Sequence, residues 1–240
     1  MSVQDTTGPV YHLSRFQHQL ILTACPRGTR ILDAHFVRDR LLPCPVWVRV
    51  ALGSGAEHVL LLRLDRSPGG VEREARLLPL LARLGVPVAE VLAGPTYDPA
   101  QPERDAMAVY SVLPGRNLLH LINHAPANHK PALANLLLEG IFRLQALTPA
   151  LAALLVSEEL GALLPRRGLR YELTEVIASQ SWADLPALRR ALEIVTPLVE
   201  QVQTPPCFWN GDFNPANFLS DGQHLTGFVD FAHACWHDPH

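Results

Sequence analysis

Residues 208–231 read FWNGDFNPANFLSDGQHLTGFVDF, and this run spaces three oxygen-bearing side chains around one short hairpin. Asp212 and Asn217 stand five residues apart in a loop. The Asp-Gly pair at 221–222 is a typical hairpin turn, so we expect the strand after it to fold back and deliver Asp230. The sequence therefore predicts that Asp212, Asn217 and Asp230 converge at the mouth of this hairpin.

These three side chains suit the transfer of a phosphoryl group from ATP. Such a transfer requires a carboxylate that orients and deprotonates the accepting hydroxyl, and hard oxygen ligands that hold Mg²⁺ against the phosphates. Asp212 fits the base, and Asn217 and Asp230 fit the metal ligands. Their order along the chain is that of the catalytic loop and the metal-binding Asp of protein kinases.

A simple turn is the alternative interpretation, because Asn, Asp, Gly and Pro are favoured in turns whatever their function. Each of these residues alone would favour it, but the complete spaced set is hard to obtain by chance. A kinase-like fold that has lost its activity would keep the same hairpin, so this second alternative stays open.

The motif of this run closely resembles that of the aminoglycoside phosphotransferase family: it reads NGDFNPANFL, followed by GFVDF and by Asp238-Pro239. Members of that family phosphorylate small molecules on a kinase-like fold. They usually carry His-Gly-Asp at the loop, where this chain has Asn210. An Asn side chain can also hydrogen-bond the backbone and hold the loop.

The resemblance implies an α+β, protein-kinase-like fold of two lobes. Residues 1–112 would form a small, nucleotide-binding lobe around an antiparallel sheet, and residues 113–240 a mainly helical catalytic lobe. Family members normally continue past the Asp-Pro with helices that complete the acceptor pocket. Because this chain stops at His240, the resemblance implies a large lobe without those helices.

Hydrophobic periodicity agrees with this build. It predicts a leading helix, three strands, a helix and two further strands, followed by a long helix and a region of helical pattern from 150 to 205. The predicted elements are residues 10–23 (helix), 31–37, 46–52 and 59–64 (strands), 71–84 (helix), 88–92 and 106–112 (strands), and 132–147 (helix).

The resemblance implies functional roles for two charged residues of the small lobe. Arg63, in the third strand, would bind the α- and β-phosphates, and Glu74, in the helix that follows, would pair with it. Kinases more often have Lys at the strand position, but Arg binds phosphate bidentately. Arg63 lies in an otherwise apolar strand, and a buried charge needs a partner.

Residues 111–116, Ser-Val-Leu-Pro-Gly-Arg, resemble the family's hinge, whose backbone at Ser111 and Leu113 would hold the adenine of ATP. An ordinary turn is the alternative, since Pro-Gly is a common turn signal. The predicted phosphate-covering loop, residues 38–45, contains no glycine, although a backbone that approaches phosphates closely usually does. The nearest glycines, in Gly53-Ser54-Gly55, fall in the next turn.

Composition excludes several other classes. The net charge is −3 without a basic block, which argues against nucleic acid as a partner. Charged residues and Pro149 interrupt the apolar stretch 133–155, which makes it a poor membrane span. The four cysteines show no CxxC pair and no secretory signal is evident, so we expect reduced thiols and a cytoplasmic protein.

We therefore expect an enzyme that transfers the γ-phosphoryl group of Mg²⁺-ATP to a hydroxyl of a small molecule. A related kinase acting on choline, a sugar or homoserine is an alternative that the resemblance does not separate. A non-catalytic binding protein on the same fold is the rival from another class, and it is favoured by Asn210 and by the glycine-poor loop. A hydrolase is excluded because the chain lacks a GxSxG elbow.

Overall fold

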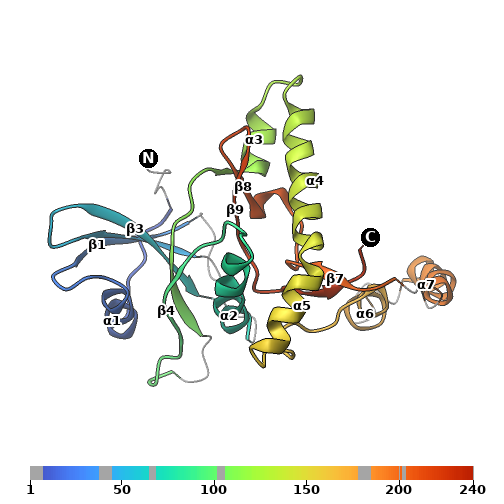
Figure 1. Cartoon of the computed structure of the whole chain (residues 1–240), viewed down its shortest axis with the longest axis horizontal. Helices are drawn as coiled ribbons and strands as arrows, with labels where there is room; N and C mark the ends of the chain where they lie inside the picture. Colours follow the sequence, from blue (N-terminus) through green and yellow to red (C-terminus); the bar gives the residue numbers. More distant parts are fainter. Residues whose placement is uncertain are drawn as a thin grey trace.

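The computed structural model describes residues 8–37, 45–64, 69–101, 106–177, 185–199, 201 and 204–239. A five-stranded antiparallel sheet occupies one end of the molecule, with strand order β1-β2-β3-β5-β4, and helices occupy the other (Figure 1). The strands are β1 (Arg30–Phe36), β2 (Val46–Ala51), β3 (Glu57–Leu64), β4 (Val91–Thr96) and β5 (Met107–Ser111). This confirms the predicted antiparallel small lobe and the mainly helical remainder.

Alternation of side chains along the strands gives the sheet two apolar faces. On β2 and β5, Val48 and Val109 point to the core beneath α1 (Arg15–Thr23). Ala108 and Tyr110 point the other way, into the core beneath α2 (Gly70–Arg83). The sheet is therefore covered by one helix on each face.

Two elements begin three or more residues after their predicted start. The leading helix begins at Arg15 rather than at residue 10, because Ser14 and Gln17 form a reciprocal capping box that starts the helix there. The strand predicted at 88–92 is displaced along the chain, since β4 runs from Val91 to Thr96. Val88 instead forms a bridge to Phe228, far along the chain.

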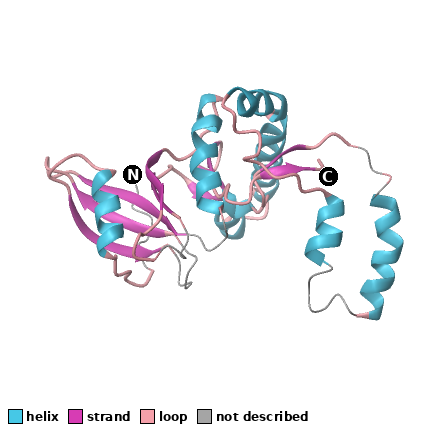
Figure 2. Cartoon of the chain, turned by 90° about the horizontal axis from the view of Figure 1, so that it is seen from below, coloured by secondary structure: helices cyan, strands magenta, loops and turns pink. Residues whose placement is uncertain are grey.

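Helix α2 joins the sheet to the helical lobe. Its buried side chains Leu77 and Leu81 belong to one continuous core with Leu144, Leu151 and the sheet face. The remaining helical elements are α3 (Leu118–His124), α4 (Lys130–Ala146), α5 (Thr148–Ser157), α6 (Leu169–Tyr171), the π-helical turn η1 (Glu172–Ile177) and α7 (Pro186–Val199). Figure 2 shows α6 and α7 projecting at the end opposite to the sheet.

Short strands near the C-terminal end form two small sheets around the predicted hairpin. β7 (Cys207–Trp209) pairs with β10 (Cys235–His237). β8 (Phe218–Ser220) pairs with β9 (Leu225–Phe228), which confirms the hairpin predicted at the Asp-Gly turn. β6 (Arg116–Asn117) adds to the free edge of β8. Because β5 ends at Ser111 and β6 belongs to the hairpin sheet, we propose the lobe boundary between residues 112 and 113.

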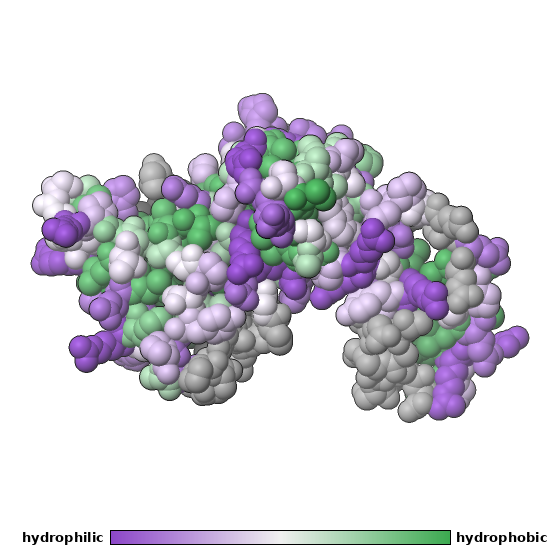
Figure 3. Space-filling view, turned by 60° about the horizontal axis from the view of Figure 1, so that its bottom comes forward, coloured by the Kyte–Doolittle hydropathy of each residue, from purple (hydrophilic) through white to green (hydrophobic). Residues whose placement is uncertain are grey.

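Close packing holds α4 against this hairpin. A Cβ atom at Gly140, within α4, would lie 2.8 Å from the ring of Phe218, so only glycine lets the helix approach this far. Large exposed apolar side chains are spread over several elements, and Figure 3 shows apolar surface in separate patches between polar ones.

Within the residues that the structure describes, no single helix has both the length and the apolar composition to cross a membrane. Helices α4 and α5 meet that test only when taken together, and they are bent by 42° where they meet.

The continuous core predicts a large difference between two leucines of the same helix. Leu144 is 0% exposed and Leu138 is 50% exposed, and both lie in α4. We expect Leu144→Ala to lower the free energy of unfolding by about 2–5 kcal/mol, because it removes packed methyl groups and leaves a cavity. Leu138→Ala is the control and should change it by no more than about 0.5 kcal/mol. Urea unfolding measures the free energy of unfolding of both variants, and an equal decrease in the two would contradict the assigned core.

Candidate active site

The loop after β7 is held by a buried amide. Asn210 is fully buried, its Oδ1 accepts a hydrogen bond from the Asp212 N–H at 3.2 Å, and its Nδ2 donates to the Asp212 carbonyl at 3.1 Å. The expectation that an Asn can hold this loop is therefore confirmed. The carboxylate of Asp212 is exposed and accepts the N–H of Asn214 at 3.0 Å through Oδ1.

Asn217 links the loop to the hairpin. It ends the 3-10 turn η2 (Pro215–Asn217), and its Nδ2 donates to the Asp212 carbonyl at 2.9 Å. Its own carbonyl accepts the N–H of Val229, the residue before Asp230, at 3.0 Å. An amide NH2 group only donates, so Oδ1 is the side-chain atom of Asn217 that could bind a cation.

The loops that carry Asp212 and Asp230 also touch directly. Gly211 has φ +101°, a conformation open to glycine, and a Cβ atom there would lie 2.5 Å from the backbone of His233. A side chain at position 211 would therefore push the two loops apart. The structure thus brings Asp212, Asn217 and the start of the Asp230 loop together, as the sequence predicts.

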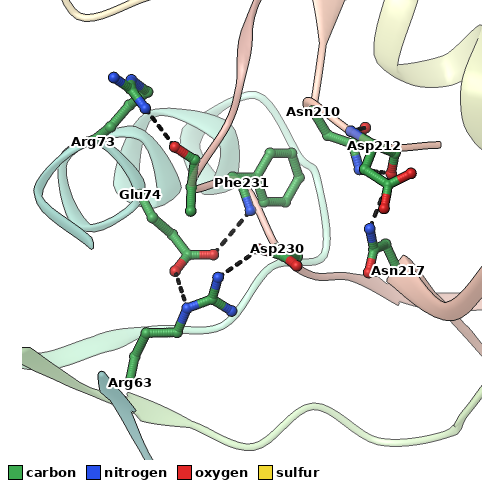
Figure 4. A network of polar contacts seen from close by, with 9 residues as sticks. Arg63, Arg73, Glu74, Asn210, Asp212, Asn217, Asp230 and Phe231 are labelled. Carbon is green, nitrogen blue, oxygen red and sulfur yellow. Dashed lines mark hydrogen bonds and ion pairs between the residues drawn. The ribbon is translucent and has the colours of Figure 1, made fainter. Parts of the chain in front are cut away.

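Asp230 faces the small lobe. Its Oδ1 accepts from Arg63 Nη2 at 2.5 Å, and Arg63 Nε lies 3.4 Å from Glu74 Oε2. Figure 4 shows the guanidinium of Arg63 between the two carboxylates. The predicted pair of Arg63 with Glu74 is confirmed, whereas its contact with Asp230 was not predicted. Glu74 is only 5% exposed, so its charge depends on these partners.

Asp230 has φ +65°, which is uncommon for a residue other than glycine. Residues in such conformations persist where the surroundings hold them, and they cluster at functional sites. One such restraint follows immediately in the chain, since the Phe231 N–H donates to Glu74 Oε1 at 2.9 Å.

The predicted hinge lies against the hairpin. Thr226 Oγ1 donates to the Pro114 carbonyl at 2.7 Å, and Leu113 packs on Gly227 of β9. Ser111 is already engaged with Glu90, donating its N–H to the Glu90 carbonyl at 2.9 Å and accepting the Glu90 N–H through Oγ at 2.8 Å. Residues 38–44 of the predicted phosphate-covering loop lie outside the described residues.

Arg73 was missed by the sequence reasoning, which assigned a role only to its neighbour Glu74. Its Nη1 donates to the Ala232 carbonyl, two residues after Asp230, and its Nε donates to the Leu163 carbonyl at 3.3 Å. The sequence does hold a signal, because a charged residue at 73 shares the apolar face of α2 with Leu77, four residues on.

Burial and hydrogen bonds shift the pKa values of several groups near the site. Burial raises the pKa of the Cys235 thiol to about 11, so this thiol stays protonated at neutral pH and is a poor nucleophile. Burial, and then the neighbouring Arg167, lower the pKa of Arg73. In the hairpin turn, backbone N–H groups of Gln223 and His224 lower the pKa of Asp221.

Comparison with known proteins gives the following relationships. The model of the phosphotransferase enzyme family matches residues 34–240. No curated protein matches the sequence. The GDP and kanamycin complex of APH(2'')-IIIa is a similar solved structure, with a TM-score of 0.63 and 22% identity over 92% of this chain and 73% of that one.

A thermostable variant of aminoglycoside phosphotransferase APH(4)-Ia in a ternary complex with ADP and hygromycin B is similar as well. Its TM-score is 0.61 and its identity 15%, over 87% of this chain and 69% of that one. These likenesses confirm the kinase-like fold.

The buried amide predicts the effect of removing it. Asn210→Leu would leave the Asp212 N–H without its partner, so we expect the free energy of unfolding to fall by about 1–3 kcal/mol. Asn135→Leu is the control, because Asn135 is exposed on α4. Chemical denaturation measures both changes. An Asn210 variant as stable as the parent would contradict the loop-holding role.

Proposed function

Because the chain belongs to the phosphotransferase enzyme family, we propose that it transfers the γ-phosphoryl group of ATP to a hydroxyl group of a small molecule. One observation carries the proposal. Asn217 donates to the Asp212 carbonyl and accepts from Val229, so a single residue ties the proposed base to the proposed metal ligand. The solved structures with this fold support a nucleotide, since those proteins are complexed with GDP and with ADP.

In the proposed mechanism Asp212 orients the acceptor hydroxyl and takes its proton. Its carboxylate is exposed to an incoming substrate, and the Asn214 N–H binds only Oδ1. The proton passes to the carboxylate as the hydroxyl oxygen bonds to phosphorus and the bond to the nucleoside diphosphate breaks.

The donor set at Asn217 and Asp230 fits Mg²⁺, which prefers amide and carboxylate oxygens together with phosphates and water. Asn217 is oriented by the bond from its Nδ2 to the Asp212 carbonyl, and the side chain of Asp230 is 40% exposed with Arg63 on Oδ1. Bound there, Mg²⁺ would neutralise charge on the phosphate oxygens. Asn217 and Asp230 would hold it.

Arg63 would bind the phosphates of the nucleotide, with Glu74 holding its side chain in place. A guanidinium has five donors in a planar fork, which can serve Glu74, Asp230 and a phosphate oxygen together. The adenine ring of ATP would lie at the hinge. We assign the backbone around Ser111 and Leu113 to adenine binding. Because the Ser111 N–H already donates to the Glu90 carbonyl, the backbone beyond Ser111 would contact the adenine.

The acceptor is proposed to be a small molecule that presents a hydroxyl. The similar structures bind kanamycin and hygromycin B. A screen of hydroxylated small molecules, aminoglycosides first, with ATP consumption and product mass as readouts, tests this part of the proposal. Absence of any phosphorylated product, with Mg²⁺-ATP bound, would contradict it.

Removing the proposed metal carboxylate should abolish Mg²⁺-dependent nucleotide binding. A ligand at about 100 times its Kd stabilises the folded state by ~2.7 kcal/mol, so the parent should show a clear rise in Tm with Mg²⁺-ATP. We expect Asp230→Ala to lose that rise, and Asp221→Asn, in the exposed hairpin turn, to keep it. An Asp230→Ala protein with the parental Mg²⁺-dependent rise would overturn the metal assignment.

Asp212→Asn should separate binding from chemistry. The amide has nearly the shape of the carboxylate but cannot accept the proton. We therefore expect the Mg²⁺-ATP rise in Tm to remain, while kcat falls by about 10²–10⁴-fold, the usual contribution of a general base. Turnover by quenched-flow or coupled assay measures kcat. A variant with parental kcat would remove Asp212 from the role of base.

A further inference from the structure

Two neighbouring side chains of α2 bind the backbone directly after Asp230. Glu74 accepts the Phe231 N–H at 2.9 Å, and Arg73 Nη1 donates to the Ala232 carbonyl. Figure 4 shows both contacts on the same short segment. The loop that carries Asp230 is therefore fixed to α2 at two consecutive residues.

Arg73 connects a third part of the molecule to these two. Its Nε donates to the Leu163 carbonyl, in the segment that follows α5. A planar guanidinium can serve two carbonyl oxygens at once with a fixed geometry between them, which a flexible ammonium does less well. Burial lowers the pKa of Arg73, and this agrees with a side chain enclosed between elements. Arg73 thus fixes the positions of α2, the Asp230 loop and the Leu163 segment relative to one another.

Asp230 needs such restraint more than an ordinary loop residue. Its φ of +65° is unfavourable for a residue with a Cβ atom, and its carboxylate already has one partner in Arg63. A loop free to relax would leave the strained conformation and carry the carboxylate away with it.

We propose that Arg73 is a positioning residue for phosphotransfer, which holds residues 230–232 so that the Asp230 carboxylate is presented to the metal. This inference rests on the proposed function. Glu74 also holds Phe231, but its loss would remove one partner of Arg63 as well. Arg73 contacts the loop without touching that ion pair, so its effect on the metal ligand can be measured separately.

The test compares Arg73→Met, Arg73→Lys and the matched control Arg76→Met. Arg76 lies on the same helix, is 56% exposed and makes a surface ion pair with Glu72 at 3.8 Å. Two quantities are measured for each variant: hydrogen–deuterium exchange of peptides covering residues 229–235 without ligands, and the Mg²⁺ concentration that gives half-maximal phosphotransfer.

Arg73→Met should speed exchange at 229–235 and raise the half-maximal Mg²⁺ concentration, each by roughly tenfold, as expected for one lost charge-assisted hydrogen bond. Arg73→Lys should recover part of both effects, because one donor can still reach a carbonyl. Arg76→Met should match the parent in both.

Parental Mg²⁺ dependence in an active Arg73→Met enzyme would overturn the role of Arg73 and leave the proposed function standing. So would faster exchange spread evenly over the chain, which indicates general destabilisation. A parent that shows no Mg²⁺-dependent nucleotide binding would instead overturn the proposed function, whatever the exchange at 229–235 shows.

Discussion

The guanidinium of Arg63 between Glu74 and Asp230 is the interaction on which the rest of the structure depends. It joins three parts of the fold that lie far apart in the sequence, namely β3, α2 and the loop after β9. An unpaired charge in the position of Glu74 would be strongly destabilising, because that carboxylate is nearly enclosed. A shift of α2 away from β3 would therefore unpair buried charge. The small lobe and the Asp230 loop are held together electrostatically rather than by apolar packing alone.

The hairpin of β8 and β9 supplies a second, uncharged connection between the lobes. The Phe228 N–H donates to the Pro87 carbonyl of the small lobe. Just past the lobe boundary, β6 pairs with β8 and the Pro114 carbonyl accepts from Thr226 Oγ1. Backbone bonds of this kind have little freedom in direction. The segments that leave the sheet are consequently anchored on the same hairpin that carries Asn217 and leads to Asp230. Under the proposed function, nucleotide contacts at the hinge would therefore reach the proposed metal ligands Asn217 and Asp230 through a few bonds.

Local signals predicted the hairpin well, because turn chemistry and spacing act over a few residues. The loop of Asp212 and Asn217 does lie against the segment around Asp230, through Val229 and His233, while the roles of the three side chains stay a prediction. The contact of Arg63 with Asp230 spans 167 positions, and no periodicity in the sequence reports such a pairing. The start of α1 could have been found, since Ser14 and Gln17 spell a capping box. The start of β4 could not have been found in this way. Val88 forms a bridge with Phe228 instead of joining the sheet, and the sequence around Val88 does not reveal that distant partner.

Asn210 bears on whether the site is catalytic. Its amide presents an acceptor and N–H donors in a fixed arrangement, and Oδ1 and one N–H bind the backbone of Asp212. A neutral imidazole also has one of each, but loses its acceptor when protonated. The Asn therefore holds the loop in this chain, and its presence does not by itself favour a non-catalytic protein. Asp230 keeps a left-handed conformation, and residues held in such conformations by their surroundings cluster at functional sites, which supports the proposed catalytic site.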